Sequence, residues 1–174
     1  MAMLLRGRVW KFGDNISTDL MMPNIAFNVP DQEKPRYCMN ANRPGWSAQV
    51  RRGDIFVAGR NLGCGSSRSA SRVLRDLGLA CAIADSASRL FLRNSINVGW
   101  PTLICAGISG IVEEGDELEV CVDSGEVQNL TNGRRLQAEG YPEDSPPAQI
   151  MRAGGLEPYL RSVLAQRRSG GGSR

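Results

Sequence analysis

The residues best suited to chemistry lie in the stretch GCGSSR, residues 63–68. Glycine lets the backbone approach a ligand closely, serine is a preferred helix cap, and the free N–H groups of a first helical turn attract anions. A cation such as Arg68 in that turn would oppose the helix dipole unless an anion lies between them. The stretch therefore predicts a carboxylate or phosphate pocket, and the alternative is a capped glycine turn with an arginine that points to solvent.

The composition excludes several other kinds of site. The chain has no histidine, which removes the commonest general base, the usual zinc ligand and every histidine-dependent triad. The five cysteines form no C-x-x-C pair, so we expect neither a disulfide framework nor a metal in this chain. Cys81, Cys105 and Cys121 sit in apolar runs and are expected to be buried, whereas Cys64 is either reactive or simply small.

Two further polar clusters accompany this stretch. The first follows an expected strand at 7–12 and comprises Asp14, Asn15, Thr18 and Asp19. The second shares one face of an expected helix at 86–99 and comprises Arg89, Arg93, Asn94 and Asn97. Each cluster is either part of a site or a simpler feature, a turn in the first case and a solvated helix edge in the second.

Alternating elements must position these residues. Apolar runs at 53–59, 79–85 and 101–107 alternate with helical patterns at 66–78 and 86–99. Strands that alternate with helices through short links predict a mostly parallel sheet. GCGSSR then lies at the carboxyl end of a strand, where open α/β folds bind their ligands.

The rest of the chain has a different character. Prolines interrupt residues 24–50, which predicts an excursion with little regular structure. Polar and apolar residues alternate at 116–122, 125–130 and 134–140, which predicts an antiparallel meander. One or two helices are expected within 145–168.

The 174 residues suit one domain, predicted at 1–168 with a flexible tail at 169–174. The net charge of +3 owes much to arginines near the end of the chain, and no basic stripe with aromatics indicates nucleic-acid binding. The sequence shows no cationic and apolar leader and no run near the roughly 20 apolar residues of a membrane helix. We therefore expect a cytoplasmic protein without membrane contact.

Three stretches together resemble a known family. GRVWKFGDNISTDLMMP, GDIFVAGRNLGCGSSR and SRLFLRNSINVGWP are similar, in order and approximate spacing, to the small subunit of 3-isopropylmalate dehydratase in the aconitase superfamily. The similarity covers about residues 7–107. It implies the swivelling β/β/α domain of that superfamily, an α/β fold with a mostly parallel core sheet and antiparallel C-terminal strands.

The resemblance also implies a reaction and a partner. The family reaction is the dehydration and rehydration of a hydroxy-dicarboxylate, which interconverts 2-isopropylmalate and 3-isopropylmalate in leucine biosynthesis. A separate large subunit would carry a 4Fe-4S cluster whose iron acts as Lewis acid, while this chain holds no cofactor. The two subunits would be active only together.

Site roles follow from the same resemblance. Ser66 would be the base, acting as an alkoxide stabilised by Arg68, the helix N-terminus and the exclusion of water. Ser67 and Arg68 would bind a substrate carboxylate, together with Gly65 and Cys64. The polar loop Asp14, Asn15, Thr18 and Asp19 and the helix residues Arg89, Arg93 and Asn94 would support them.

The chain departs from the family pattern after this motif. Relatives usually continue with glutamate and histidine, whereas this chain has Ser69 and Ala70. In the excursion at 24–46, where the family reads the substrate's side group, Asn28 or Arg36 could take that role. Three alternatives remain: isopropylmalate, another hydroxy-diacid of the dimethylmalate, citramalate or homocitrate type, or a non-catalytic anion-binding module. The sequence also leaves open the assembly stoichiometry and whether the isolated chain self-associates.

Overall fold

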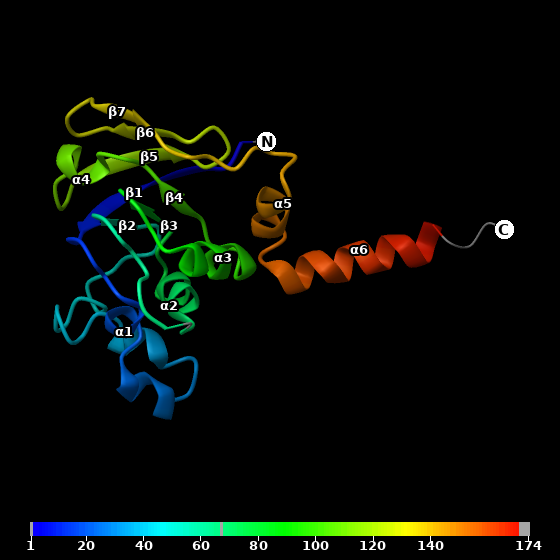
Figure 1. The fold of residues 1–174 in the computed structure, drawn as a ribbon, viewed down its shortest axis with the longest axis horizontal. Coiled ribbons are helices and arrows are strands. Elements are labelled where there is room, and N and C mark those ends of the chain that lie inside the picture. The colour runs from blue at the N-terminus through cyan, green and yellow to red at the C-terminus, as the bar shows by residue number, and fades with distance from the viewer. Residues whose placement is uncertain (1, 67, 171–174) are drawn as a thin grey trace.

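A single curved sheet organises the part of the chain that the computed structural model describes, residues 2–66 and 68–170 (Figure 1). Its seven strands run in the order β4-β3-β2-β1-β5-β6-β7. Their bounds are Leu4–Lys11 (β1), Ile55–Ala58 (β2), Cys81–Ala84 (β3), Thr102–Ile104 (β4), Glu117–Cys121 (β5), Glu126–Asn129 (β6) and Arg135–Gln137 (β7). The expected α/β class is confirmed.

The sheet has a parallel half and an antiparallel half. β1, β2, β3 and β4 pair in parallel, with Trp10 opposite Phe56 and Phe56 opposite Ala82. β5 joins the other edge of β1 antiparallel and continues into β6 and β7 as a meander. All residues of β2 and β3 are buried because this half is covered on both faces. The expected mostly parallel core with antiparallel C-terminal strands is therefore confirmed.

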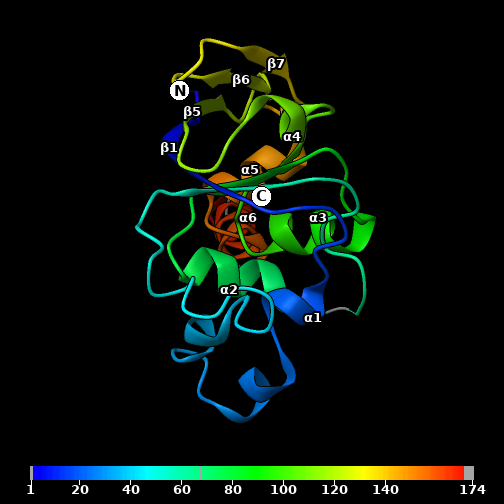
Figure 2. The ribbon, with the colours of Figure 1, turned by 90° about the vertical axis from the view of Figure 1, so that its left-hand side faces the viewer.

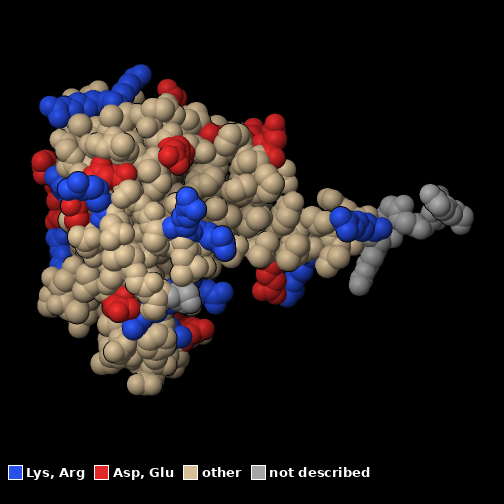
Figure 3. Space-filling model, in the orientation of Figure 1, with Lys and Arg blue, Asp and Glu red and all other residues tan. Residues whose placement is uncertain are grey.

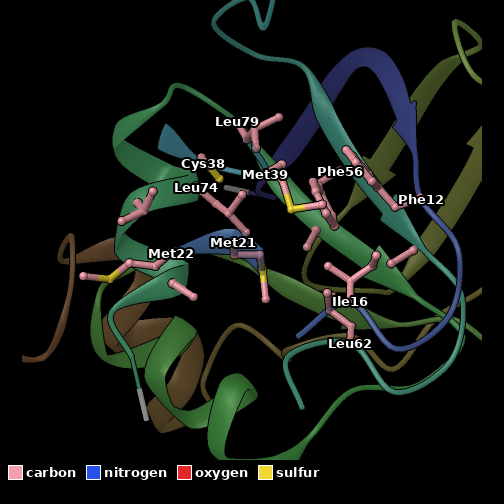
Figure 4. Packing of buried hydrophobic residues seen from close by; sticks show 14 of the residues in the cluster. Phe12, Ile16, Met21, Met22, Cys38, Met39, Phe56, Leu62, Leu74 and Leu79 are labelled. Atoms are coloured by element: carbon pink, nitrogen blue, oxygen red, sulfur yellow. The ribbon is translucent and has the colours of Figure 1, made fainter. Parts of the chain in front are cut away.

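Helices cover both faces of the parallel half. Their bounds are Thr18–Met21 (α1), Ala70–Asp76 (α2), Arg89–Asn97 (α3), Ile108–Ile111 (α4), Pro146–Arg152 (α5) and Leu156–Gly170 (α6). Figure 2 shows α1 and α2 on the side of the sheet opposite to α4. One buried cluster lies under α1, α2 and α3 and includes Phe56 and Leu74 (Figure 4). A second, around Val57 and Leu118, lies on the other face.

The excursion at 24–50 contains only two short 3-10 helices, Asn24–Asn28 and Lys34–Tyr37, in line with the little regular structure expected there. Trp46 attaches it to the body. Its ring is fully buried and packs edge-on against Phe12, with 5.2 Å between the ring centroids. The excursion is therefore held at its far end by the same core that supports the parallel strands.

Three helix predictions need correction. α2 begins at Ala70 and not at residue 66, because the backbone at Gly65 is left-handed; Ser69 is the N-cap, although its side chain makes no capping hydrogen bond. The loop expected at 14–19 contains the short α1, where the Ser17 side chain accepts a hydrogen bond from the Leu20 amide. The four-residue α4 was not expected at all.

The C-terminal segment forms two helices. α6 extends to Gly170, and the remainder of the expected tail, 171–174, lies outside the described residues. Pro146 stands in the first turn of α5, as the sequence predicts. α6 leaves the body of the molecule and projects away from it (Figure 1).

Candidate functional site

Two loops meet where β1 and β2 end. The Gly63 amide donates to the Ile16 carbonyl at 2.7 Å, and the Thr18 amide donates to the Cys64 carbonyl at 2.9 Å. Ser17 and Cys64 form a short parallel bridge. Because β1 and β2 are parallel neighbours, their following loops emerge at the same edge. The structure thus brings the first polar cluster against the GCGSSR stretch.

Glycine is required at two positions of this contact. Gly63 has φ +72°, and a Cβ there would lie 2.2 Å from the ring of Phe91. Gly65 has φ +109°, and a Cβ there would lie 3.1 Å from Thr18 Oγ1. A side chain at either position would strain the left-handed backbone and crowd the neighbouring atoms, so replacing either glycine would lower stability. The loop can therefore pack against α1 and α3 only with these glycines.

Ser66, Arg68 and Asp19 form the chemical centre of the loop. Arg68 Nε lies 3.1 Å from Ser66 Oγ and 2.7 Å from Asp19 Oδ1. Ser66 Oγ also lies within 3.4 Å of Asp19 Oδ1, to which it donates. The Arg68 side chain is 16% exposed and the Asp19 side chain 58%. A largely buried cation thus stands behind an exposed hydroxyl and an exposed carboxylate.

Further contacts fix the orientation of Arg68. Arg68 Nη1 donates to the Met22 carbonyl at 2.8 Å, and the guanidinium lies 5.0 Å from the centroid of the Phe27 ring. Thr18 Oγ1 donates to the Ser66 carbonyl at 2.9 Å. A planar guanidinium held on several sides presents its remaining donors in a fixed direction. The arrangement suits recognition of a carboxylate.

The expectation that Arg68 lies in the first turn of a helix and opposes its dipole is wrong. Arg68 precedes the helix, because α2 starts two residues later at Ala70. The anion beside it is Asp19, 49 positions away in the chain, which the sequence placed in a separate supporting cluster. Ser67, predicted to bind substrate, lies outside the described residues.

Asp14 and Asn15 support the start of the loop, and neither makes a hydrogen bond to Ser66 within the described part of the chain. Asp14 Oδ1 accepts from the Arg60 amide at 2.7 Å, and Asn15 Oδ1 accepts from Asn61 Nδ2 at 2.9 Å. These bonds continue the pairing of β1 and β2 beyond the strands. Sequence reasoning missed the partners Arg60 and Asn61, although they lie only a few residues before the motif.

The helix cluster is split by the structure. A hollow of about 310 Å³ lies beside Arg68, and its lining is Arg68, Ser69, Ser71, Arg72, Asn94, Asn97 and Val98. Asn94 thus shares the hollow with Arg68, while Arg89 and Arg93 are exposed on α3 outside its lining. Ser88, the N-cap of α3, donates to the Gly63 carbonyl at 2.7 Å, a link that sequence reasoning also missed.

The cysteines differ in burial. Cys81 and Cys105 are fully buried as expected, and burial raises the pKa of Cys81 to about 12 and that of Cys105 to about 11. Burial also raises the pKa of Cys38 far above its ordinary value. Cys121 is half-buried, so the expectation that it is buried was wrong. Cys64 is half-buried beside the site.

Within residues 2–66 and 68–170, no group of three or more Cys, Asp or Glu side chains is placed to hold a metal ion. No helix in the described part of the chain is long and apolar enough to cross a membrane.

Comparison with known proteins agrees with the fold. The aconitase C-terminal domain family matches residues 11–106. The isopropylmalate/citramalate isomerase small subunit of Methanocaldococcus jannaschii is 44% identical over 95% of this chain and 99% of its own length. The 2,3-dimethylmalate dehydratase small subunit of Eubacterium barkeri is 38% identical over 92% of this chain and 99% of its own length.

A solved structure is also similar. The crystal structure of 3-isopropylmalate dehydratase from Methanocaldococcus jannaschii superposes with a TM-score of 0.89 and 32% identity, covering 97% of this chain and 100% of that one. The chain therefore belongs to the aconitase C-terminal domain family. Within it, the resemblance to small subunits of 3-isopropylmalate dehydratase is confirmed over nearly the whole chain.

Proposed function

We propose that this chain is the cytoplasmic small subunit of a hydro-lyase that interconverts 2-isopropylmalate and 3-isopropylmalate for leucine biosynthesis. The observation that carries the proposal is the contact of Ser66 Oγ with Arg68 Nε at 3.1 Å on an exposed loop. The names of the relatives support the reaction class. The chain would act with a large subunit whose 4Fe-4S cluster supplies the Lewis acid for the hydroxyl group.

Ser66 would take the proton from the carbon next to a carboxylate. A free serine is far too weak an acid to serve as alkoxide, so a positive group must lie against its oxygen. Arg68 Nε does so at 3.1 Å and is largely buried. Exclusion of water by the large subunit would strengthen this attraction.

Arg68 would also hold a substrate carboxylate. In the free chain its Nε is paired with Asp19 Oδ1 at 2.7 Å. A substrate carboxylate would join or displace this acid, whose side chain is 58% exposed. Ser69 and Ala70 stand where relatives usually have glutamate and histidine. Asp19 supplies an acidic neighbour for Arg68 in place of the missing glutamate. The departure from the family pattern is thus compatible with activity.

Reconstitution tests this function. The chain is mixed anaerobically with the cluster-loaded large subunit from the same cell, and the unsaturated product is followed by its absorbance. Ser66→Ala should lower kcat by about a thousandfold or more and leave KM within a few fold. Ser124→Ala, in a turn of the meander where Ser124 Oγ accepts from the Glu126 amide, is the matched control and should keep full activity. Full turnover in Ser66→Ala would contradict the proposed base.

A second substrate class has support from two observations. Relatives are named for citramalate and for 2,3-dimethylmalate. Beside Arg68, the exposed Phe27 ring lies 5.0 Å from the guanidinium and offers an apolar surface, which favours a small alkyl group on the diacid. Comparing kcat/KM of the assembled enzyme for isopropylmalate, citramalate and dimethylmalate decides between them. A preference for either alternative would replace the substrate and keep the reaction class.

A further inference from the structure

The C-terminal helix α6 has an apolar stripe that the described chain leaves uncovered. Leu156, Leu160 and Leu164 follow each other at intervals of four residues, so they share one face of the helix. Leu160 is 47% and Leu164 55% exposed. From Leu156 to Arg167, no residue of α6 is buried.

The helix is attached to the body near its base. Tyr159 donates from its hydroxyl to Gln149 Oε1 of α5 at 3.1 Å. Figures 1 and 3 show the remainder as an arm that stands clear of the body. A 15-residue helix, about 22 Å long, is marginal in water without tertiary packing. Its exposed leucine face is therefore suited to packing against another protein.

The stripe forms one wall of a groove that leads to the site. The groove has a volume of about 400 Å³ and is lined by Arg72, Asn97, Val98, Leu156, Glu157, Leu160, Arg161 and Leu164. Three of these residues, Arg72, Asn97 and Val98, also line the hollow beside Arg68. A protein that covers the hollow at Arg68 thus meets the α6 groove next.

We infer that the α6 groove is a docking surface for the large subunit, which inserts an apolar ridge flanked by acidic side chains. This inference rests on the proposed function, in which that subunit covers Ser66 and Arg68. The charge of the groove favours acidic groups on the partner, because Glu157 is paired with Arg161 at 2.6 Å, which leaves the positive charge of Arg72 unbalanced among the lining residues. A second copy of this chain would bring the same arginines toward each other across a symmetric contact.

The test measures binding and not turnover. The double variant Leu160→Gln/Leu164→Gln changes exposed positions, so its circular dichroism and melting curve should match those of the unmodified chain. Leu4→Gln is the matched control, since Leu4 is 58% exposed at the start of β1 and does not line the α6 groove. Titration of the cluster-loaded large subunit should give a Kd at least about tenfold higher for the double variant and within about twofold for Leu4→Gln.

A charge variant provides an independent measurement. Arg72→Gln should weaken the complex at low salt and flatten its salt dependence, whereas Arg135→Gln on β7 should do neither. Equal Kd values for the double variant and the unmodified chain overturn the docking inference and leave the proposed function intact. The same holds if the double variant loses only self-association, seen by sedimentation of the isolated chain. If the unmodified chain binds no large subunit, both proposals fail.

Discussion

In the parallel half of the sheet, β1 and β2 both lead into polar loops at one edge, whereas in the antiparallel half β5 and β6 are joined by a tight turn at 122–125. Parallel neighbours need long crossovers that start at the same edge, so their loops collect polar groups from distant parts of the chain. Antiparallel neighbours send successive turns to opposite edges. The difference explains why Asp19 meets Arg68 in one half, while the meander mainly completes the core.

The largest expected effect is a difference in the rate of thiol labelling between cysteines, both within one half of the sheet and between the two halves. At pH 8, a thiol with a pKa of about 12, such as that of Cys81, is ionised in only about one molecule in ten thousand. Because its pKa is raised, the thiolate becomes abundant only at strongly alkaline pH. Cys64 and Cys121, both half-buried, should react at least about a hundredfold faster than Cys81 or Cys105.

The large subunit makes this labelling a test of the two halves. Binding should protect Cys64, next to the site, and leave Cys121 on β5 reactive, as peptide mapping by mass spectrometry would show. Protection of Cys121 with Cys64 unchanged would place the partner on the meander and contradict the comparison.

Two glycines with similar φ angles distinguish the cost of backbone strain from the cost of a steric clash. Gly63 has φ +72° and would place a Cβ 2.2 Å from Phe91, whereas Gly133, in a turn of the meander, has φ +76° with no atom within 4 Å of that position. Gly63→Ala should lower the free energy of unfolding by about 3 kcal/mol or more, and Gly133→Ala by only about 1 kcal/mol. Urea denaturation of both variants measures the difference. Equal losses would mean that backbone strain alone sets the cost.

Two buried threonines sharpen the comparison further. Thr18 donates to the Ser66 carbonyl at 2.9 Å, while the Thr102 hydroxyl has no hydrogen-bond partner among the described residues. Thr18→Val should cost about 1 kcal/mol of stability and raise KM, because it releases the loop. Thr102→Val should be neutral or slightly stabilising. Unchanged KM in Thr18→Val would show that this bond does not hold the site.

The smallest effect is expected at the ion pair between Arg43 of the excursion and Glu114 of the loop before β5. Arg43 Nη1 donates to Glu114 Oε2 at 2.7 Å, and this bond lowers the pKa of Glu114. Its contribution is present above the ordinary carboxyl pKa and is lost as pH falls through the lowered value. The Glu114 side chain is 41% exposed, so Glu114→Gln should cost no more than about 0.5 kcal/mol at pH 7 and less than that at pH 3. Melting curves at both pH values test this.

The sequence predicts elements best where local pattern and packing agree. β2 and β3 are short apolar runs bounded by glycine or polar residues, and both were expected close to their observed positions. α1 and α4 were missed because four residues are too few for a helical period. The start of α2 was placed early because Ser66 and Ser69 are both good caps by residue type, and only the left-handed Gly65 backbone decides between them.

The sequence predicted which residues belong to the site but not how they are arranged in space. GCGSSR and the cluster at 14–19 were both recognised, but their contact depends on the pairing of β1 with β2, which no local pattern specifies. Asn94 and Arg93 are adjacent in sequence, yet only Asn94 borders the hollow beside Arg68. The uncovered stripe of α6 also could not be foreseen, since a helical period shows which face is apolar but not what covers it.

The pairing of Lys11 with Val57 is the last of the register between β1 and β2, and both site loops begin directly after it. A shift of one residue in this register would turn the side chains of one strand to the opposite face. It would also move Asp19 away from Arg68 by the length of about one residue. A chain that folded with its strands out of register would therefore lose affinity for its substrate. Measuring ligand binding would then show whether a newly made chain has folded in the correct register.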